Sequence, residues 1–224
     1  MIFSRVRLDP ASREVWHWVR HASALHGALW RAFPGVHHDS PNARARIRLL
    51  HRVEVNRSAQ EIVLYAQAEP VPRWDTLPVL GTPQIRNVDA IHENIRAGDE
   101  LAFRLCVHPR VHRQQWRTAV SPTEREPVGA PVVCARAYAC RGVGAIAWLK
   151  SRCERFGFTF DPESVVTIDE RHEKIKGEPH ATTRFDGRLR VLDAEAFRAA
   201  LQNGVGPRKA YGCGLLTVAA ARTP

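Results

Sequence analysis

Near its C-terminal end the chain carries the run GVGPRKAYGCGLL, residues 204–216, whose residue types could bind phosphate. Glycines allow the backbone to approach a ligand closely. Arg208 and Lys209 supply positive charge, and Tyr211 offers an aromatic face on which a base could stack. These residue types suit a loop that binds phosphate, either of a nucleotide cofactor or of a nucleic-acid backbone. The glycines of this loop are Gly204, Gly206, Gly212 and Gly214.

The spacing of these glycines does not match the nucleotide-binding motifs. After Gly204 and Gly206 the next glycine is Gly212, so neither GxGxxG nor GxxxxGK[ST] is present. Those motifs also run strand, loop, helix, so that a helix N-terminus faces the phosphate, whereas here we expect helix, loop, strand. We therefore expect no cofactor. Two readings stay open: a turn that needs glycine for its backbone alone, or a contact with a polynucleotide.

Histidines provide the second set of candidates. His17 and His21 are four residues apart in HWVRH, but the HExxH zinc motif needs a glutamate where Trp18 stands. The cluster 37–39, HHD, has no further ligand at a metal-binding spacing, so we expect no metal site. His26 differs, because at about 100° per residue it lies about 40° from the centre of the apolar helix stripe. It points into the core or into a cleft.

Charge indicates the class of partner. The chain of 224 residues has 33 Lys and Arg against 23 Asp and Glu, a formal net charge of +10, and most of the cations are arginine. This excess favours an anionic partner, and arginine is suited to bidentate phosphate contacts.

Five cysteines without CxxC spacing argue against a zinc ribbon or a disulfide framework. Arg5 and Arg7 and the lack of a long apolar run predict a cytoplasmic protein without membrane contact.

Hydrophobic periodicity predicts the elements that must position these residues. In the first half the expected order is strand, helix, strand, strand, helix, strand, over residues 2–8, 13–33, 46–55, 61–68, 87–96 and 100–107. The second half repeats this order, over residues 131–138, 143–155, 164–176, 181–192, 194–202 and 214–220.

The predicted fold class is therefore α+β, with two tandem ferredoxin-like (RRM-like, βαββαβ) domains. The expected division is a first domain over 1–108, a linker or loop over 109–130, and a second domain over 131–224. A four-stranded sheet of this topology is a common platform for RNA.

Several segments resemble a known family. LHGALWRAFPG at 25–35, EPVPRW at 69–74, AWLKSRCERFGF at 147–158 and the glycine-rich run at 204–216 are similar to the CasE family of CRISPR repeat endoribonucleases, from the type I-E system. The resemblance covers both ends and the middle of the chain.

That resemblance implies an activity and partners. The family cleaves precursor CRISPR RNA without metal at the 3′ base of the repeat stem-loop, stays bound to the mature crRNA and joins the other subunits of the Cascade surveillance complex. It implies that His26 is the catalytic histidine, and relatives can carry a basic residue at the place of Arg31. Where some relatives have a tyrosine, three residues before the histidine, this chain has Ser23. A non-catalytic RNA-binding subunit is thus the alternative.

RNA supplies its own nucleophile, the 2′-hydroxyl. Cleavage therefore requires proton transfer, which an imidazole can perform, and a cation such as Arg31 to stabilise the developing charge.

The long hairpin expected over 164–190 and the preceding helix are basic and could follow an RNA stem. Together with Arg208, Lys209 and Tyr211, the expected RNA-binding residues are Arg152, Arg155, Arg171, Lys174, Lys176 and Arg184.

Overall fold

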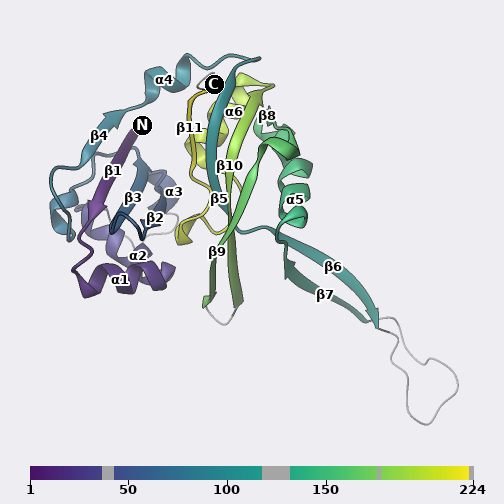
Figure 1. Cartoon of the computed structure of the whole chain (residues 1–224), viewed down its shortest axis with the longest axis horizontal. Helices are drawn as coiled ribbons and strands as arrows, with labels where there is room; N and C mark the ends of the chain where they lie inside the picture. Colours follow the sequence, from purple (N-terminus) through teal and green to yellow (C-terminus); the bar gives the residue numbers. More distant parts are fainter. Residues whose placement is uncertain (37–42, 118–131, 176–177, 222–224) are drawn as a thin grey trace, which may run out of the picture.

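The computed structural model of the chain describes residues 1–36, 43–117, 132–175 and 178–221. Two antiparallel sheets stand side by side, and a two-stranded ribbon projects away from them (Figure 1). None of the described helices is long and apolar enough to cross a membrane.

The first sheet has the strand order β2-β3-β1-β4, formed by β1 (Ile2–Leu8), β2 (Leu50–Asn56), β3 (Glu61–Ala68) and β4 (Gln84–Asn87). Alternate residues of β1 face the core, because Val6 and Leu8 are buried while Arg7 is exposed. Residues 46–55 were expected as one strand. The strand begins only at Leu50, after the short helix α3 (Ala43–Arg46).

The helix expected over 13–33 is divided into α1 (Arg13–Arg20) and α2 (Ala22–Leu29), followed by a 3-10 turn, η1 (Trp30–Ala32). His21 between them has an extended backbone, with φ −129° and ψ 100°. One straight helix of that length would measure about 31 Å, whereas a seven-residue strand spans about 23 Å. The break lets Val15 of α1 and Leu25 of α2 both bury against one sheet.

The second sheet has the order β11-β5-β10-β8, with β9 also paired to β10. Two helices pack against it, α5 (Val143–Cys153) and α6 (Ala194–Asn203). Its strands are β5 (Glu100–Val107), β8 (Phe158–Thr159), β9 (Val166–Ile175), β10 (Glu178–Val191) and β11 (Leu216–Ala220).

The strand at 100–107 corrects the expected order of elements. We expected it to close the first sheet, but β5 lies between β10 and β11 in the second. Its inward residues Phe103, Leu105 and Val107 bury in the second core. The first sheet is closed by β4 instead, and the helix expected over 87–96 is the short α4 (Asp89–Glu93), after that strand. The sheets therefore divide between β4 and β5 and not at residue 108.

The segment expected as a linker, 109–130, begins with a strand. β6 (Arg110–Arg117) pairs with β7 (Val132–Ala139) in the projecting ribbon, and residues 118–131 lie outside the described part of the chain. We expected β7 to be the first strand of the second sheet, a place that β5 occupies.

Each sheet nevertheless has the ferredoxin-like strand order. Numbered along the chain, the four strands of the first sheet lie in the order 2-3-1-4. The strands β5, β9, β10 and β11, numbered 1 to 4 in the same way, lie in the order 4-1-3-2, which is the same order read from the opposite edge. In the first unit the connection over 69–83 holds the 3-10 turn η2 (Trp74–Thr76) in place of a second α-helix. The predicted class, α+β with two tandem ferredoxin-like domains, is confirmed.

The glycine-rich loop between α6 and β11 docks onto the first sheet. A Cβ atom on Gly204, where φ is +77°, would lie 2.8 Å from Leu50 Cδ2 and 2.9 Å from the Gly214 carbonyl oxygen. The loop is closed by the Val205 amide, which donates to the Gly214 carbonyl at 2.9 Å, and held to β5 by the Gly214 amide, which donates to the Cys106 carbonyl at 2.7 Å. Only glycine fits this contact between the two sheets.

We expect Gly204→Ala to lower the free energy of unfolding by about 1–3 kcal/mol, because the added methyl group meets Leu50 and the backbone is in the left-handed half of φ space. Urea denaturation measures the effect. The control is Gly27→Ala in α2, where a Cβ meets nothing within 4 Å and stability should be unchanged or rise by about 0.5–1 kcal/mol. An unchanged unfolding midpoint for Gly204→Ala would contradict this account of the docking.

Candidate active site between the two sheets

His26 lies where the glycine-rich loop meets the first domain. It is half-buried on α2, and its ring stands edge-on to Trp30 and Tyr211, with centroids 5.7 Å and 6.2 Å away. Trp30 is four residues on and so shares its side of the helix. Tyr211 belongs to η5 (Lys209–Tyr211), a 3-10 turn inside the loop. The two segments singled out in the sequence, near opposite ends of the chain, thus form one site.

The environment of His26 favours its neutral form. Burial, and secondly the charge of Arg44, lower the pKa of His26 below its ordinary value. The buried Nδ1 atom has no hydrogen-bond partner among the described residues. A neutral imidazole carries one nitrogen that can accept a proton. The site therefore holds a group that can take a proton at neutral pH.

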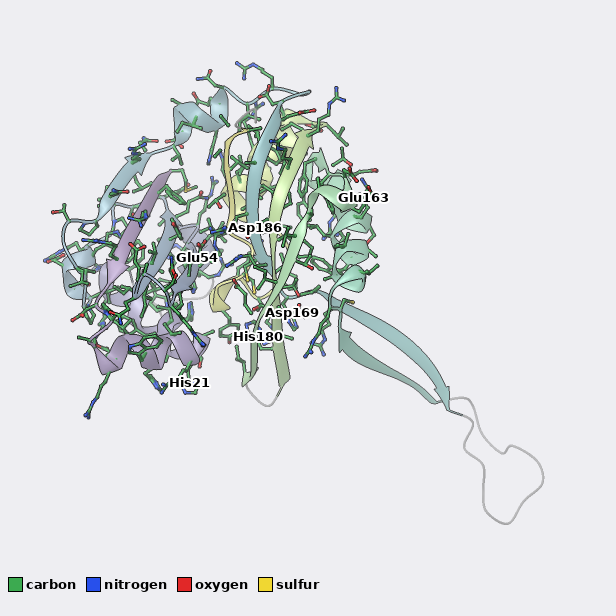
Figure 2. The ribbon with its side chains drawn as sticks, in the orientation of Figure 1. His21, Glu54, Glu163, Asp169, His180 and Asp186 are labelled. Atoms are coloured by element: carbon green, nitrogen blue, oxygen red, sulfur yellow. The ribbon has the colours of Figure 1, made fainter. Side chains whose placement is uncertain are left out.

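Two further histidines, which the sequence did not single out, extend the site. His180 lies on β10, and the centroid of its ring is 5.9 Å from that of Tyr211. Figure 2 shows His180 toward the lower end of the strand. His108 is 5.3 Å from His180 and donates from Nδ1 to the Ala181 carbonyl at 2.6 Å. No local pattern marks either residue, because only strand pairing between β5 and β10 brings them together.

Arg31, expected to assist His26, is turned toward α1. Its guanidinium pairs with Glu14 at 2.9 Å and lies 5.3 Å from the centre of the Trp18 ring. The cation whose charge acts on His26 is Arg44, on α3. Arg44 precedes an expected strand and had no distinguishing signal in the sequence. A role for Arg31 in cleavage stays a prediction.

The glycines of the loop shape its backbone, whereas the side chain of Arg208 reaches Tyr211 at the site. Gly204, Gly206, Gly212 and Gly214 all have positive φ, and a Cβ on Gly214 would lie 2.9 Å from the Val205 carbonyl oxygen. These glycines therefore serve the tight loop, and their contact with RNA stays a prediction. Arg208, in a left-handed conformation with φ 63°, places its guanidinium 5.9 Å from the Tyr211 ring centre. Lys209 is half-buried.

The other expected RNA contacts occupy different environments. Arg184 pairs with Glu170 at 2.9 Å and Asp186 at 3.0 Å, so its charge is neutralised within the protein. Arg152 lies over the Trp148 ring, whereas Arg155 is exposed above Phe156. Arg171 and Lys174 lie on β9, and Lys176 is outside the described residues.

The histidine clusters seen in the sequence do not form a metal site among the described residues. In the described ranges no group of three His, Cys, Asp or Glu side chains is placed to hold a metal ion. The His17 and His21 rings lie 4.8 Å apart on the outside of the first helix pair, and His37, His38 and Asp39 fall outside the described residues.

We expect His26 to titrate below the ordinary histidine pKa of about 6.5. As pH falls through that value the imidazole stays neutral, and it takes up its proton only at lower pH. Arg44→Gln should raise the pKa of His26 but leave it below the ordinary value, because burial is the larger cause. NMR titration of the His26 ring measures both, with Arg46→Gln, an equal charge change on the same helix, as control. A His26 pKa at or above 6.5 in the unaltered protein would contradict this environment.

Comparison with known proteins supports a common ancestry over nearly the whole chain. The CRISPR-associated endoribonuclease Cse3 of Thermus thermophilus is 29% identical over 236 residues, covering 98% of this chain and 100% of that protein. The CRISPR system Cascade subunit CasE of Escherichia coli K12 is 29% identical over 206 residues, covering 90% and 94%.

A solved structure agrees. Thermus thermophilus Cse3 bound to an RNA representing a pre-cleavage complex superposes with a TM-score of 0.73 at 27% identity, over 97% of this chain and 98% of that one. The family model of CRISPR-associated proteins matches residues 1–220. With His26, Tyr211 and the glycine-rich loop joined in one site, and a match that runs from the first strand through the last, this chain belongs to the family of CRISPR-associated proteins.

Proposed function

We propose that the chain is a metal-independent endoribonuclease that cleaves the stem-loop of CRISPR repeats in precursor crRNA, at the 3′ base of the stem. It keeps the mature crRNA and works in the cytoplasm with the other subunits of a type I-E surveillance complex. The relatives named as an endoribonuclease and as a Cascade subunit support this. The observation that carries it is the half-buried His26 at the junction of the two domains, between Arg44 of the first domain and Tyr211 of the second.

The chemistry proposed for this site needs only RNA, protein and water. The 2′-hydroxyl loses its proton to His26, its oxygen bonds to the adjacent phosphorus, and the bond from phosphorus to the 5′-oxygen breaks. The leaving oxygen takes a proton from water. The products are a 2′,3′-cyclic phosphate and a 5′-hydroxyl. Because burial and Arg44 keep His26 neutral, we assign it the role of general base.

A non-catalytic RNA-binding subunit of the same fold is the second candidate. The observation that favours it is Ser23, an exposed residue where some relatives have a tyrosine. Tyr211, from the other domain, brings a phenol ring to His26 in this chain. Binding of a repeat stem-loop without cleavage across pH 6–9 would support the binding subunit over the nuclease.

The first test is cleavage of the repeat hairpin from the CRISPR array beside the gene. We expect wild-type protein to cut it in EDTA, His26→Ala to slow the cut by about 10²–10⁴-fold because proton transfer is lost, and a 2′-deoxy at the cleavage site to leave RNA bound but uncut. Gel analysis of single-turnover reactions measures all three. His21→Ala, an exposed histidine before α2, is the control. Loss of cutting in EDTA, or full activity of His26→Ala, would overturn the mechanism.

Salt dependence separates RNA-binding arginines from structural ones. We expect Arg155→Gln to weaken stem-loop binding and to reduce the slope of log K against log salt by about 0.9, the value for one lost phosphate contact on a duplex. Arg184→Gln should instead lower the free energy of unfolding by about 1–3 kcal/mol, since Glu170 and Asp186 lose their partner. Fluorescence anisotropy and urea denaturation measure the two effects. The reverse pattern would show that Arg184 contacts RNA.

A further inference from the structure

A small basic cavity lies at the junction of the two domains. It has a volume of about 150 Å³, several times the roughly 30 Å³ that one water occupies in the liquid. Residues of the first domain come from α3, the turn after it and the start of β2, and residues of the second come from the end of α6 and the glycine-rich loop. The lining is Arg44, Ala45, Arg48, Leu50, Gln202, Asn203 and Lys209.

Among the described residues, two of the three cations that line this cavity, Arg44 and Lys209, have no carboxylate partner. Lys209 makes no hydrogen bond or ion pair with any described residue, although it is half-buried. Arg44 donates to the neutral Leu49 carbonyl at 2.9 Å and forms no ion pair within the described part of the chain. Arg48 pairs with Glu69 at 3.3 Å and donates to Gln202. Two cations that share a desolvated cavity repel each other unless an anion joins them.

The electrostatics of the two cations agree with this geometry. Burial lowers the pKa of Arg44, and burial followed by the charge of Arg44 lowers the pKa of Lys209. Both cations are thus held where water solvates them poorly, and the charge of Arg44 also disfavours the charged form of Lys209. Such a pair is ready to bind an anion, because the anion relieves both penalties.

The cavity lies next to His26. Arg44 acts electrostatically on both His26 and Lys209. Lys209 begins the 3-10 turn that ends at Tyr211, whose ring stands against His26. An anion bound between Arg44 and Lys209 would therefore be close to the imidazole that the proposed mechanism uses as its base.

We propose that the Arg44–Lys209 cavity binds the phosphate of the cleavage site. This inference rests on the proposed nuclease function and names the part of the substrate that the two cations hold. The guanidinium of Arg44 suits two oxygens of one phosphate, and the ammonium of Lys209 supplies a point charge opposite it. Both stabilise the negative charge that grows on the phosphoryl oxygens as the 2′-oxygen attacks. Binding also compensates Arg44, which raises the basicity of His26 when substrate arrives.

The decisive experiment removes one charge from the protein and one from the RNA. The full chain is titrated with repeat stem-loop RNA that has a 2′-deoxy at the cleavage site and either a normal phosphate or a neutral methylphosphonate at that linkage. We expect the methylphosphonate to weaken wild-type binding by about 10–100-fold, the range for a charged hydrogen-bonding group. For Lys209→Met we expect weak binding of both RNAs, with the penalty reduced several-fold because its partner is gone.

Matched variants control for folding and for net charge. Lys209→Met keeps the methylene groups that pack near Gly214. Lys209→Arg keeps the charge and should retain the wild-type penalty. Arg46→Gln removes a charge from an exposed position of the same helix, outside the cavity, and should also retain it. An equal penalty in wild type and Lys209→Met, or a wild-type penalty at another linkage only, would overturn the proposal.

An RNA-free measurement distinguishes this inference from the nuclease function. Inorganic phosphate is titrated into the protein while the NMR signal of the His26 ring is followed. We expect a shift in wild type that is absent in Lys209→Met. If this shift is seen but the protein does not cleave RNA, the anion site is supported and the nuclease function is overturned. Cleavage of the stem-loop together with no shift and no change in the methylphosphonate penalty would overturn the site while the nuclease function stands.

Discussion

The buried guanidinium of Arg52 joins the two sheets, and the geometry of the site depends on it. Its side chain is 4% exposed, pairs with Glu54 at 2.8 Å, and donates to the Leu215 carbonyl at 3.0 Å and the Thr217 hydroxyl at 3.1 Å. A buried arginine without these acceptors would cost several kcal/mol, so β11 is held in one position against β2. Because the glycine-rich loop leads directly into β11, the same contact holds Lys209 and Tyr211 against the domain that carries His26.

The described basic residues at the junction of the two sheets differ in their partners. Arg104 and Arg184 are paired with Glu54, Asp186 and Glu170 in an ion-pair cluster between the sheets; Figure 2 shows Glu54 and Asp186 on the facing strands β2 and β10. Arg44 and Lys209 have no carboxylate among the described residues. A net charge of +10 indicates an anionic partner, but only this division shows which cations are available to it.

Local patterns predicted most elements, and failed where the outcome depended on distant pairing. The alternation of β1 and β3 and the capping aspartate Asp193 of α6 are short-range signals, and the structure has these elements as expected. The strand at 100–107 was equally clear as a strand, but alternation does not say which sheet it joins. Its aromatic and aliphatic residues pack with Phe158 and Phe185, which follow it by more than fifty positions. The single expected helix over 13–33 divided because it must fit a short sheet.

The sequence by itself determined the class of fold, the positive charge and, through the resemblance of its two ends to one family, the candidate histidine. These depend on residue type and local order, which a sequence states directly. The tertiary structure decided which side chains surround His26. Tyr211 and Arg44 come from two separate segments, and His180 contacts Tyr211 from a third; their proximity follows from the docking of one sheet on the other. It also turned Arg31 toward Glu14, because a long cation pairs with the carboxylate that folding brings within reach.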